Sequence, residues 1–264
     1  MSARFHILTL ILLAGCLSAR GQDLRTGIPL REGQYLAAGE YLAWLDEEGN
    51  ILRTRPLDRT LTALVECGGH LFSIDTEGKE LLQPARDGRI VRKIHLPAQG
   101  RLCALATDGD ILWAVTDAGE ILHGNDDSGW RVLDFNAQYA GYYPQMAFWA
   151  VAVGGGSVMV AGTRPDGTPA VFTSSRGTVW NERSLDYTEA GSTCTFSALP
   201  MALSYDAAQD RFYLLGSDGE ELALPGCSHC NSHTHYPVNT LYARISAGFG
   251  TLLLGSDGFR KRVI

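Results

Sequence analysis

Short apolar runs alternate with glycine-containing turns along the chain, and this pattern repeats. The clearest case is the hexapeptide Leu-Leu-Gly-Ser-Asp-Gly, which occurs at 214–219 and again at 253–258. An apolar run that ends in Asp-Gly is typical of a strand entering a tight turn, because glycine adopts positive φ readily and aspartate tolerates it. Weaker copies of the turn come earlier in the chain, and the six turn glycines are Gly49, Gly78, Gly119, Gly167, Gly219 and Gly258.

Successive turn glycines are 29 to 52 residues apart. A period of about 40 residues built from strands is typical of β-propeller blades. Each unit predicts an innermost strand of small apolar residues, such as 102–106, then a bulkier strand before the turn and two strands after it. No stretch keeps a 3.6-residue apolar period, so little helix is expected. We predict an all-β protein whose residues 23–264 form one β-propeller domain of six four-stranded blades.

The two ends of the chain are predicted to close this ring together. The last unit has room for three strands, because the chain stops six residues after Gly258. The segment 24–30 is expected to be the fourth, outer strand of that last blade, which would leave no open sheet edge inside the ring. Pro29 has no N–H, and a proline fits best at such an edge.

The first 22 residues have the pattern of an export signal. Arg4 precedes the apolar run 5–13, which is too short to span a bilayer, and small residues follow. Leu-Ala-Gly-Cys at 13–16 matches the bacterial lipobox, in which Cys16 is lipidated and becomes the mature N-terminus. The alternative is ordinary cleavage after Gly21. We therefore expect an exported protein that is a lipoprotein of the bacterial cell envelope, or is secreted or periplasmic.

The charge balance excludes some partners. The formal net charge is −7, and it becomes about −9 when the leader with Arg4 and Arg20 is removed. This acidic balance argues against a nucleic-acid partner and against binding to anionic lipid through a cluster of basic residues. Contact with a membrane is expected only through a lipid anchor at Cys16.

Residues 173–180 carry a pattern known from one group of propellers. Thr173, Gly177 and Trp180 match S/T-x-D-x-G-x-T-W, with Ser175 in place of the aspartate, and 125–130 is a shortened version. The segment resembles the Asp-box, or bacterial neuraminidase repeat, and roughly a third of the chain is similar to propellers of sialidases and photosystem-II assembly factors. The resemblance implies that this segment lies between the third and fourth strands of its blade. It implies a fold and no activity.

The densest group of metal-ligating residue types is Cys-Ser-His-Cys-Asn-Ser-His-Thr-His at 227–235. Cys227, Cys230, His233 and His235 could hold zinc, although zinc-ligand pairs are usually a dozen or more residues apart. In an exported protein Cys227 and Cys230 could instead form a disulfide. A solvated loop with neither feature is the third interpretation. No other cofactor is expected.

Tyrosines gather in the connections between blades. Tyr139, Tyr142 and Tyr143 lie between the third and fourth units, and Tyr187 lies between the fourth and fifth. Such connections emerge on one face of a propeller, where the tyrosines could stack on a sugar or anchor a protein. The alternative is that they pack over the gap between two blades. The aspartates of the six turns are interpreted as turn formers, and we assign no catalytic residue.

These features predict an exported, lipid-anchored, non-catalytic β-propeller that binds an envelope or extracellular protein or a glycan. A glycan-acting hydrolase or lyase on the same scaffold is the alternative. A metal-binding or thiol-redox function at 227–235 is a second alternative.

Overall fold

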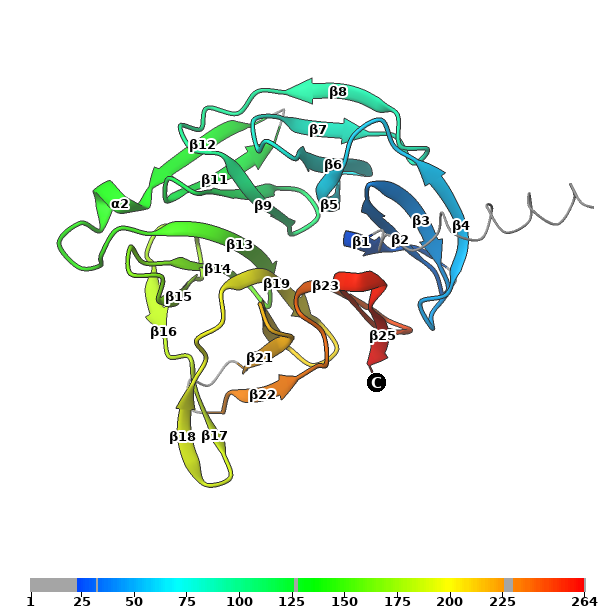
Figure 1. The fold of residues 1–264 in the computed structure, drawn as a ribbon. Coiled ribbons are helices and arrows are strands. Elements are labelled where there is room, and N and C mark those ends of the chain that lie inside the picture. The colour runs from blue at the N-terminus through cyan, green and yellow to red at the C-terminus, as the bar shows by residue number, and fades with distance from the viewer. Residues whose placement is uncertain (1–22, 32, 126–127, 226–229, 264) are drawn as a thin grey trace, which may run out of the picture.

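The computed structural model describes residues 23–31, 33–125, 128–225 and 230–263. Six antiparallel sheets stand around a central axis, and each sheet follows the chain from the axis outward (Figure 1). Five of these sheets have four strands, and the last sheet has three. The predicted all-β fold with six propeller blades is therefore confirmed.

The strands occupy equivalent places in the blades. The innermost strands are β1 (Leu24–Pro29), β5 (Leu61–Cys67), β9 (Leu102–Thr107), β13 (Ala147–Gly154), β19 (Pro200–Asp206) and β23 (Leu241–Ala247). The second strands are β2 (Tyr35–Gly39), β6 (His70–Asp75), β10 (Leu112–Thr116), β14 (Ser157–Thr163), β20 (Arg211–Gly216) and β24 (Gly250–Gly255). The third strands are β3 (Tyr41–Leu45), β7 (Leu81–Pro84), β11 (Glu120–Asn125), β15 (Pro169–Ser174), β21 (Glu220–Pro225) and β25 (Arg260–Val263). The fourth strands are β4 (Ile51–Pro56), β8 (Ile90–Ile94), β12 (Gly129–Asp134), β16 (Asn181–Arg183) and β22 (Ser232–His235).

The Asp-Gly turns have the conformation that the sequence predicts. All six turn glycines have φ between +68° and +86°. In the second blade, Asp75 accepts hydrogen bonds from the backbone N–H groups of Lys79 (2.8 Å) and Glu80 (3.2 Å). Asp218 and Asp257 themselves adopt positive φ. The turn aspartates whose contacts are described thus shape the hairpins, which agrees with their interpretation as turn formers.

The first blade departs from the predicted strand order. Segment 24–29 is its innermost strand β1, paired with β2, and is not an outer strand of the last blade. The turn at Gly49 therefore joins the third and fourth strands, whereas the other five turns join the second and third. Burial explains the difference. Leu24 and Ile28 of β1 are buried in the apolar cores on either side of this blade, and an outer position would expose them.

The ring closes by packing of the terminal blades, without a shared sheet. Strand β1 lies beside β23, and the apolar cluster of the first and sixth blades joins Leu24 to Ile245. The hydroxyl of Tyr35 donates a hydrogen bond to the carbonyl oxygen of Gly250 (3.0 Å). The sixth sheet ends at β25, whose residues are exposed or half-buried, and its run of Arg and Lys is typical of a protected sheet edge.

Apolar side chains fill the spaces between neighbouring blades in six clusters. Short elements outside the blades are α2 (Phe135–Gln138), the hairpin of β17 (Asp186–Glu189) and β18 (Ser192–Thr195), and the 3₁₀ turn η1 (Ser256–Gly258). Among the described residues, no helix has the length and apolar character needed to span a bilayer.

Candidate functional site

The innermost strands surround a central channel of about 530 Å³. Its wall is built from the six strands that lie nearest to the axis, in which Ala, Val, Thr and Ser are common. A cavity of several hundred Å³ at this position suits a small ligand or an inserted side chain. The channel is therefore a candidate ligand-binding site.

Every innermost strand has an irregularity at the same place. The pairing with the second strand shifts near the start of each innermost strand, so that one residue, or two in β5 (Thr62 and Ala63), lacks a cross-strand partner. A bulge of this kind re-aims a side chain and is common beside functional sites. The bulged residues, here called the bulge ring, are Arg25, Thr62, Cys103, Trp149, Met201 and Tyr242, and all six line the channel.

The bulge ring lies at one end of the channel. Each bulge is near the start of its innermost strand, so it opens toward the face where the chain enters each blade; we call this the loop face. Four members of the ring also line a hollow of about 340 Å³ that reaches the turn Asp75–Gly78. The ring is consequently accessible from the loop face.

The ring has two chemically different halves. In blade order, Cys103, Trp149 and Met201 come from the third, fourth and fifth blades and form an apolar half. The other half is polar and comes from the sixth, first and second blades, and its members are Tyr242, Arg25 and Thr62. Because blades one and four are opposite in a six-bladed ring, the guanidinium and the indole come from opposite sides of the mouth.

Arg25 is a cation without a carboxylate partner. It is exposed, and within the described chain its one recorded contact is with the Tyr242 ring, whose centroid lies 5.9 Å from the guanidinium carbon. The Tyr242 hydroxyl donates to Asp23 (3.2 Å), and burial followed by the Asp23 charge raises the pKa of that hydroxyl. The guanidinium donors of Arg25 are therefore available to an anion.

The apolar half is fixed in place. The indole N–H of Trp149 donates to the Thr163 hydroxyl (3.0 Å), which orients the ring system against its blade. Burial raises the pKa of the Cys103 thiol to about 12, and its sulfur donates to the Arg101 carbonyl oxygen (3.3 Å). A thiol that stays protonated at neutral pH is a poor nucleophile, so Cys103 contributes apolar surface.

Carboxylates and histidines are scarce among the described residues of the channel wall. Among the described lining residues the one carboxylate is Glu66, which is ion-paired with Arg86 (2.8 Å), and there is no histidine. The six side chains of the ring include neither type. The arrangement can hold a ligand by stacking, apolar contact and charge.

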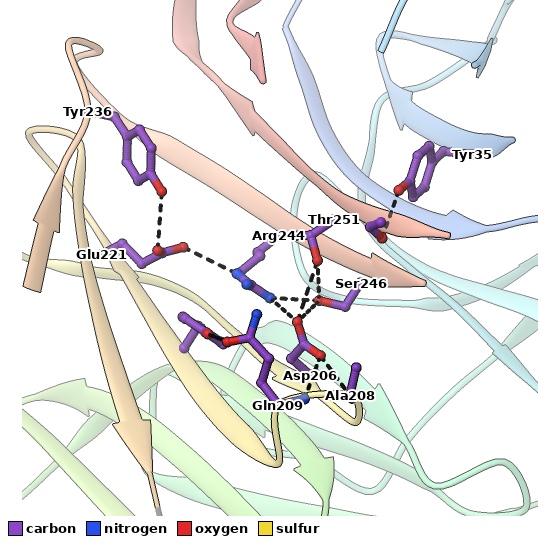
Figure 2. Close-up of polar contacts among 11 residues, drawn as sticks. Tyr35, Asp206, Ala208, Gln209, Glu221, Tyr236, Arg244, Ser246 and Thr251 are labelled. Atoms are coloured by element: carbon purple, nitrogen blue, oxygen red, sulfur yellow. Dashed lines mark hydrogen bonds and ion pairs between the residues drawn. The ribbon is translucent and has the colours of Figure 1, made fainter. Parts of the chain in front are cut away.

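A second polar cluster lies at the seam between the fifth and sixth blades (Figure 2). Buried Arg244 donates from Nη1 to Asp206 (3.0 Å), lies with Nε 3.3 Å from Oε2 of Glu221, and stacks on the Tyr213 ring. Asp206 also accepts from the backbone N–H groups of Ala208 and Gln209. The cluster adds polar contacts to a seam whose described apolar core consists of buried Leu215, Tyr236, Leu241 and Leu253, with Ala202, Val238, Phe259 and Val263 packed against them.

The two carboxylates of this cluster differ electrostatically. Burial raises the pKa of Glu221, and the Arg244 charge offsets this only in part. Burial also acts on Asp206, but the hydrogen bond and charge of Arg244 outweigh it and lower the pKa of that carboxyl. Burial, with the nearby Glu221, raises the pKa of Tyr236 to about 12. Because the donors and acceptors face one another, the cluster is a structural link between blades.

The tyrosines singled out from the sequence divide into two kinds. Tyr139 and Tyr143 pack against Phe135, and Tyr143 also contacts Phe172, so both extend the core between the third and fourth blades. The Tyr139 hydroxyl accepts from the backbone N–H of Trp180 (3.0 Å). Tyr142, in contrast, is 83% exposed and points away from this core. None of the three lines the central channel.

Tyr187 occupies a different place from the one expected. It lies in the β17–β18 hairpin, which projects from the rim of the ring (Figure 1), and its ring stacks on His233 of β22 at 4.5 Å. Asn231 donates to the carbonyl oxygens of Ser184 and Asp186 and so holds the hairpin against β22. The sequence had suggested that the connection carrying Tyr187 emerges on the same face as the one carrying Tyr139, Tyr142 and Tyr143. That placement is wrong, because contacts with β22 draw it outward.

The Cys/His segment is only partly described. Cys227, with its proposed zinc and disulfide roles, and the lipidation site Cys16 lie outside the described residues. His233 has its Nε2 3.7 Å from a Glu220 carboxylate oxygen, while Cys230 and His235 are exposed. In the part of the chain that the structure describes, no group of three or more His, Cys, Asp or Glu side chains could hold a metal ion.

Sequence reasoning missed the bulge ring. A signal was present, because a residue larger or more polar than alanine stands at the second position of five innermost strands and at the third position of β13. Without the strand register, that residue could not be told apart from an outward-facing neighbour.

No protein-family model and no curated protein matches the chain. Solved structures are similar in fold. Virginiamycin B lyase from Staphylococcus aureus has a TM-score of 0.61 at 11% identity, covering 94% of this chain and 86% of the lyase. Its catalytically inactive histidine-to-alanine variant with quinupristin has a TM-score of 0.61 at 10% identity, covering 93% and 85%. A chain of a nidogen/laminin complex has a TM-score of 0.62 at 15% identity, covering 83% of each chain.

At such low identity these similarities establish the β-propeller fold and nothing finer. The resemblance of 173–180 to the Asp-box rests on the residues alone. Its segment does lie between β15 and β16, the third and fourth strands, with Trp180 buried.

Proposed function

We propose that this protein is an exported β-propeller, anchored to the bacterial envelope through a lipid on Cys16, that binds a protein or glycan partner and performs no chemistry. The observation that carries the proposal is the bulge ring. Six separate bulges direct one side chain from each blade into a single mouth on the loop face. A repeated structural irregularity that assembles unlike side chains at one place is expected of a recognition site.

Binding is favoured over catalysis by the composition of this mouth. The described channel residues provide an indole, a phenol, a thioether and a guanidinium. Aromatic and arginine side chains are the residues that most often anchor a partner. One fold neighbour belongs to a protein–protein complex, and others are lyases.

A capture experiment tests the binding site. The purified protein is immobilised, exposed to an envelope extract and to a glycan array, and the bound species is identified and rebound in pure form. We expect Trp149→Ala to weaken binding at least about tenfold, the usual size of an anchor residue's contribution. Tyr142→Ala is the matched control, because that aromatic side chain is exposed on the loop side outside the channel. If Tyr142→Ala loses partner binding and Trp149→Ala does not, the binding site lies at the exposed Tyr142 and not at the channel.

The anchor is tested separately. Cys16→Ala should release the protein from membranes into the soluble fraction without altering its circular dichroism, because lipid transfer needs the cysteine thiol. Release of the wild-type protein to the same extent would support ordinary cleavage after Gly21 and remove the lipid from the proposal.

A further inference from the structure

The two halves of the bulge ring specify a class of ligand, and this step rests on the function proposed above. We infer that the bulge ring binds an amphipathic organic acid, with an apolar or aromatic group on the Trp149 side and a carboxylate at Arg25. The inference uses the order of the blades, the partners of each charge around the mouth and the size of the channel.

Arg25 is the cation at this mouth that is free to bind a carboxylate of the ligand. Carboxylates near the loop-face mouth already have donors. Asp23 accepts from Tyr242 and from the backbone N–H of Gly258, while Glu77 pairs with Lys79. Arg101, which lines the adjoining hollow, pairs with Asp117 (2.7 Å). Arg25 alone among the described cations lining the mouth has no hydrogen bond or ion pair, and its five donors match a carboxylate.

The apolar half of the bulge ring offers a surface for an apolar group of the ligand. Trp149 presents a flat surface whose polar N–H is already satisfied by Thr163, so the rest of the ring system offers apolar contact. Met201 from the next blade adds an adaptable thioether, and Cys103 from the preceding blade adds a neutral thiol. An aromatic or aliphatic group is complementary to this surface.

The geometry links the two halves. Arg25 and Trp149 come from blades one and four, which face each other across the channel, so one molecule has to present its acid and its apolar group at opposite ends. The channel volume of about 530 Å³ falls in the range of small-molecule sites. Two sources provide this chemistry, a free aromatic carboxylic acid and the C-terminal residue of a polypeptide.

The experiment is calorimetric titration of the purified protein with matched probes. The probes are 3-phenylpropionate and its uncharged amide, and a blocked peptide ending in phenylalanine as free acid and as amide. Each acid is expected to bind about tenfold or more tightly than its amide, because a hydrogen bond to a charged group contributes about that factor. If the peptide acid binds more tightly than 3-phenylpropionate, the natural ligand is a polypeptide C-terminus. If 3-phenylpropionate binds more tightly, the natural ligand is a small carboxylic acid.

Variants assign the two ends of the ligand. Arg25→Gln should remove the preference for acid over amide and leave amide binding unchanged. Arg131→Gln, an exposed arginine on β12, is the control and should bind both like the wild type. Trp149→Ala should weaken the binding of acid and amide by similar factors. Trp149→Phe keeps an aromatic ring and should bind both probes more tightly than Trp149→Ala does.

The inference is overturned if acid and amide bind equally, if Arg131→Gln acts as strongly as Arg25→Gln, or if no probe binds at about 10 mM, where even millimolar ligands are detected. Failure here can be separated from failure of the proposed function. If no acid binds but Trp149→Ala still abolishes partner capture, the ligand class is wrong and the binding site stands. If capture is also unaffected, both fail.

Discussion

At the scale of single residues, the repeated Leu-Leu-Gly-Ser-Asp-Gly hexapeptide contains two glycines with different tasks. The last glycine forms the turn through its positive φ. The first, at 216 and 255, ends the second strand, where the chain entering the blade passes very close. Gly162 is equivalent, because a Cβ there would lie 2.0 Å from the Ala147 carbonyl oxygen. These glycines leave room beside the bulge that directs the next side chain into the channel.

Gly162→Ala should lower the free energy of unfolding by about 2 kcal/mol or more, since the added methyl group meets backbone that cannot move aside. Gly167→Ala is the comparison. That glycine has φ +84° and open space around it, so only about 1 kcal/mol is expected from its backbone conformation. Urea unfolding of both variants measures the difference, and equal losses would show that the close approach is unimportant.

Tyr143→Ala should destabilise the protein by about 3 kcal/mol, because the ring packs against Phe135 and Phe172 in the core. Tyr142→Ala should stay within about 0.5 kcal/mol of the wild type, as is usual for an exposed side chain. Thermal unfolding followed by circular dichroism compares them. A strongly destabilised Tyr142 variant would contradict the division between packing and exposed tyrosines.

At the scale of elements, the seam between the fifth and sixth blades adds a buried ion-pair cluster to its apolar packing. Arg244 of β23 reaches Asp206 at the end of β19 and Glu221 of β21. One guanidinium therefore joins strands β19, β21 and β23. Removal of one partner from a buried ion pair leaves an uncompensated charge and costs about 3 kcal/mol or more.

Asp206→Asn should therefore destabilise the fold by about 3 kcal/mol at neutral pH. The pKa of Asp206 is lowered in the folded state, so its stabilising contribution is present at neutral pH and is lost as the pH falls through that lowered value. The gap between wild type and variant, measured by urea unfolding, should shrink in acid. A gap that is constant with pH would exclude the charge as its cause.

Glu221→Gln should show the opposite pH trend. Burial raises the pKa of Glu221, so this residue favours the fold when protonated, and that contribution is lost as the pH rises through the raised value. Glutamine keeps an acceptor for Arg244 without titrating. The stability of the variant relative to wild type should thus increase from acid to neutral pH, and the same urea series measures it. The reverse trend would show that the pairing with Arg244 outweighs burial.

At the scale of the whole molecule, the chain forms a ring whose first and last blades pack against each other without sharing a sheet. Strand β1 is the inner wall of the first blade and contacts the last blade through the cluster of Leu24 and Ile245. The β17–β18 hairpin, in contrast, lies on the rim (Figure 1). Removal of each segment should accordingly have very different consequences.

Deletion of residues 23–30 should abolish the cooperative thermal transition, because it removes an innermost strand and part of two interblade cores. Replacement of 187–194 by two glycines should keep the transition, since those residues belong to no blade. Calorimetry of the two variants tests this difference. A folded deletion variant would mean that β1 is dispensable, as an outer strand would be.

The sequence alone determined the fold class, the number of blades and the turns, because strand period and glycine conformation are local properties that repeat six times. It could not assign β1, because an edge proline fits an innermost strand as well as an outer one, and only the burial of Leu24 and Ile28 decides between them. For Tyr139 and Tyr143 the sequence left open a binding surface or packing between two blades, and only their contacts with Phe135 show that they pack. The bulge ring also required tertiary structure. A bulge is a relation between two strands, and the mouth that it lines is a relation among six blades, so residues such as Arg25 and Trp149 come together only when the ring closes.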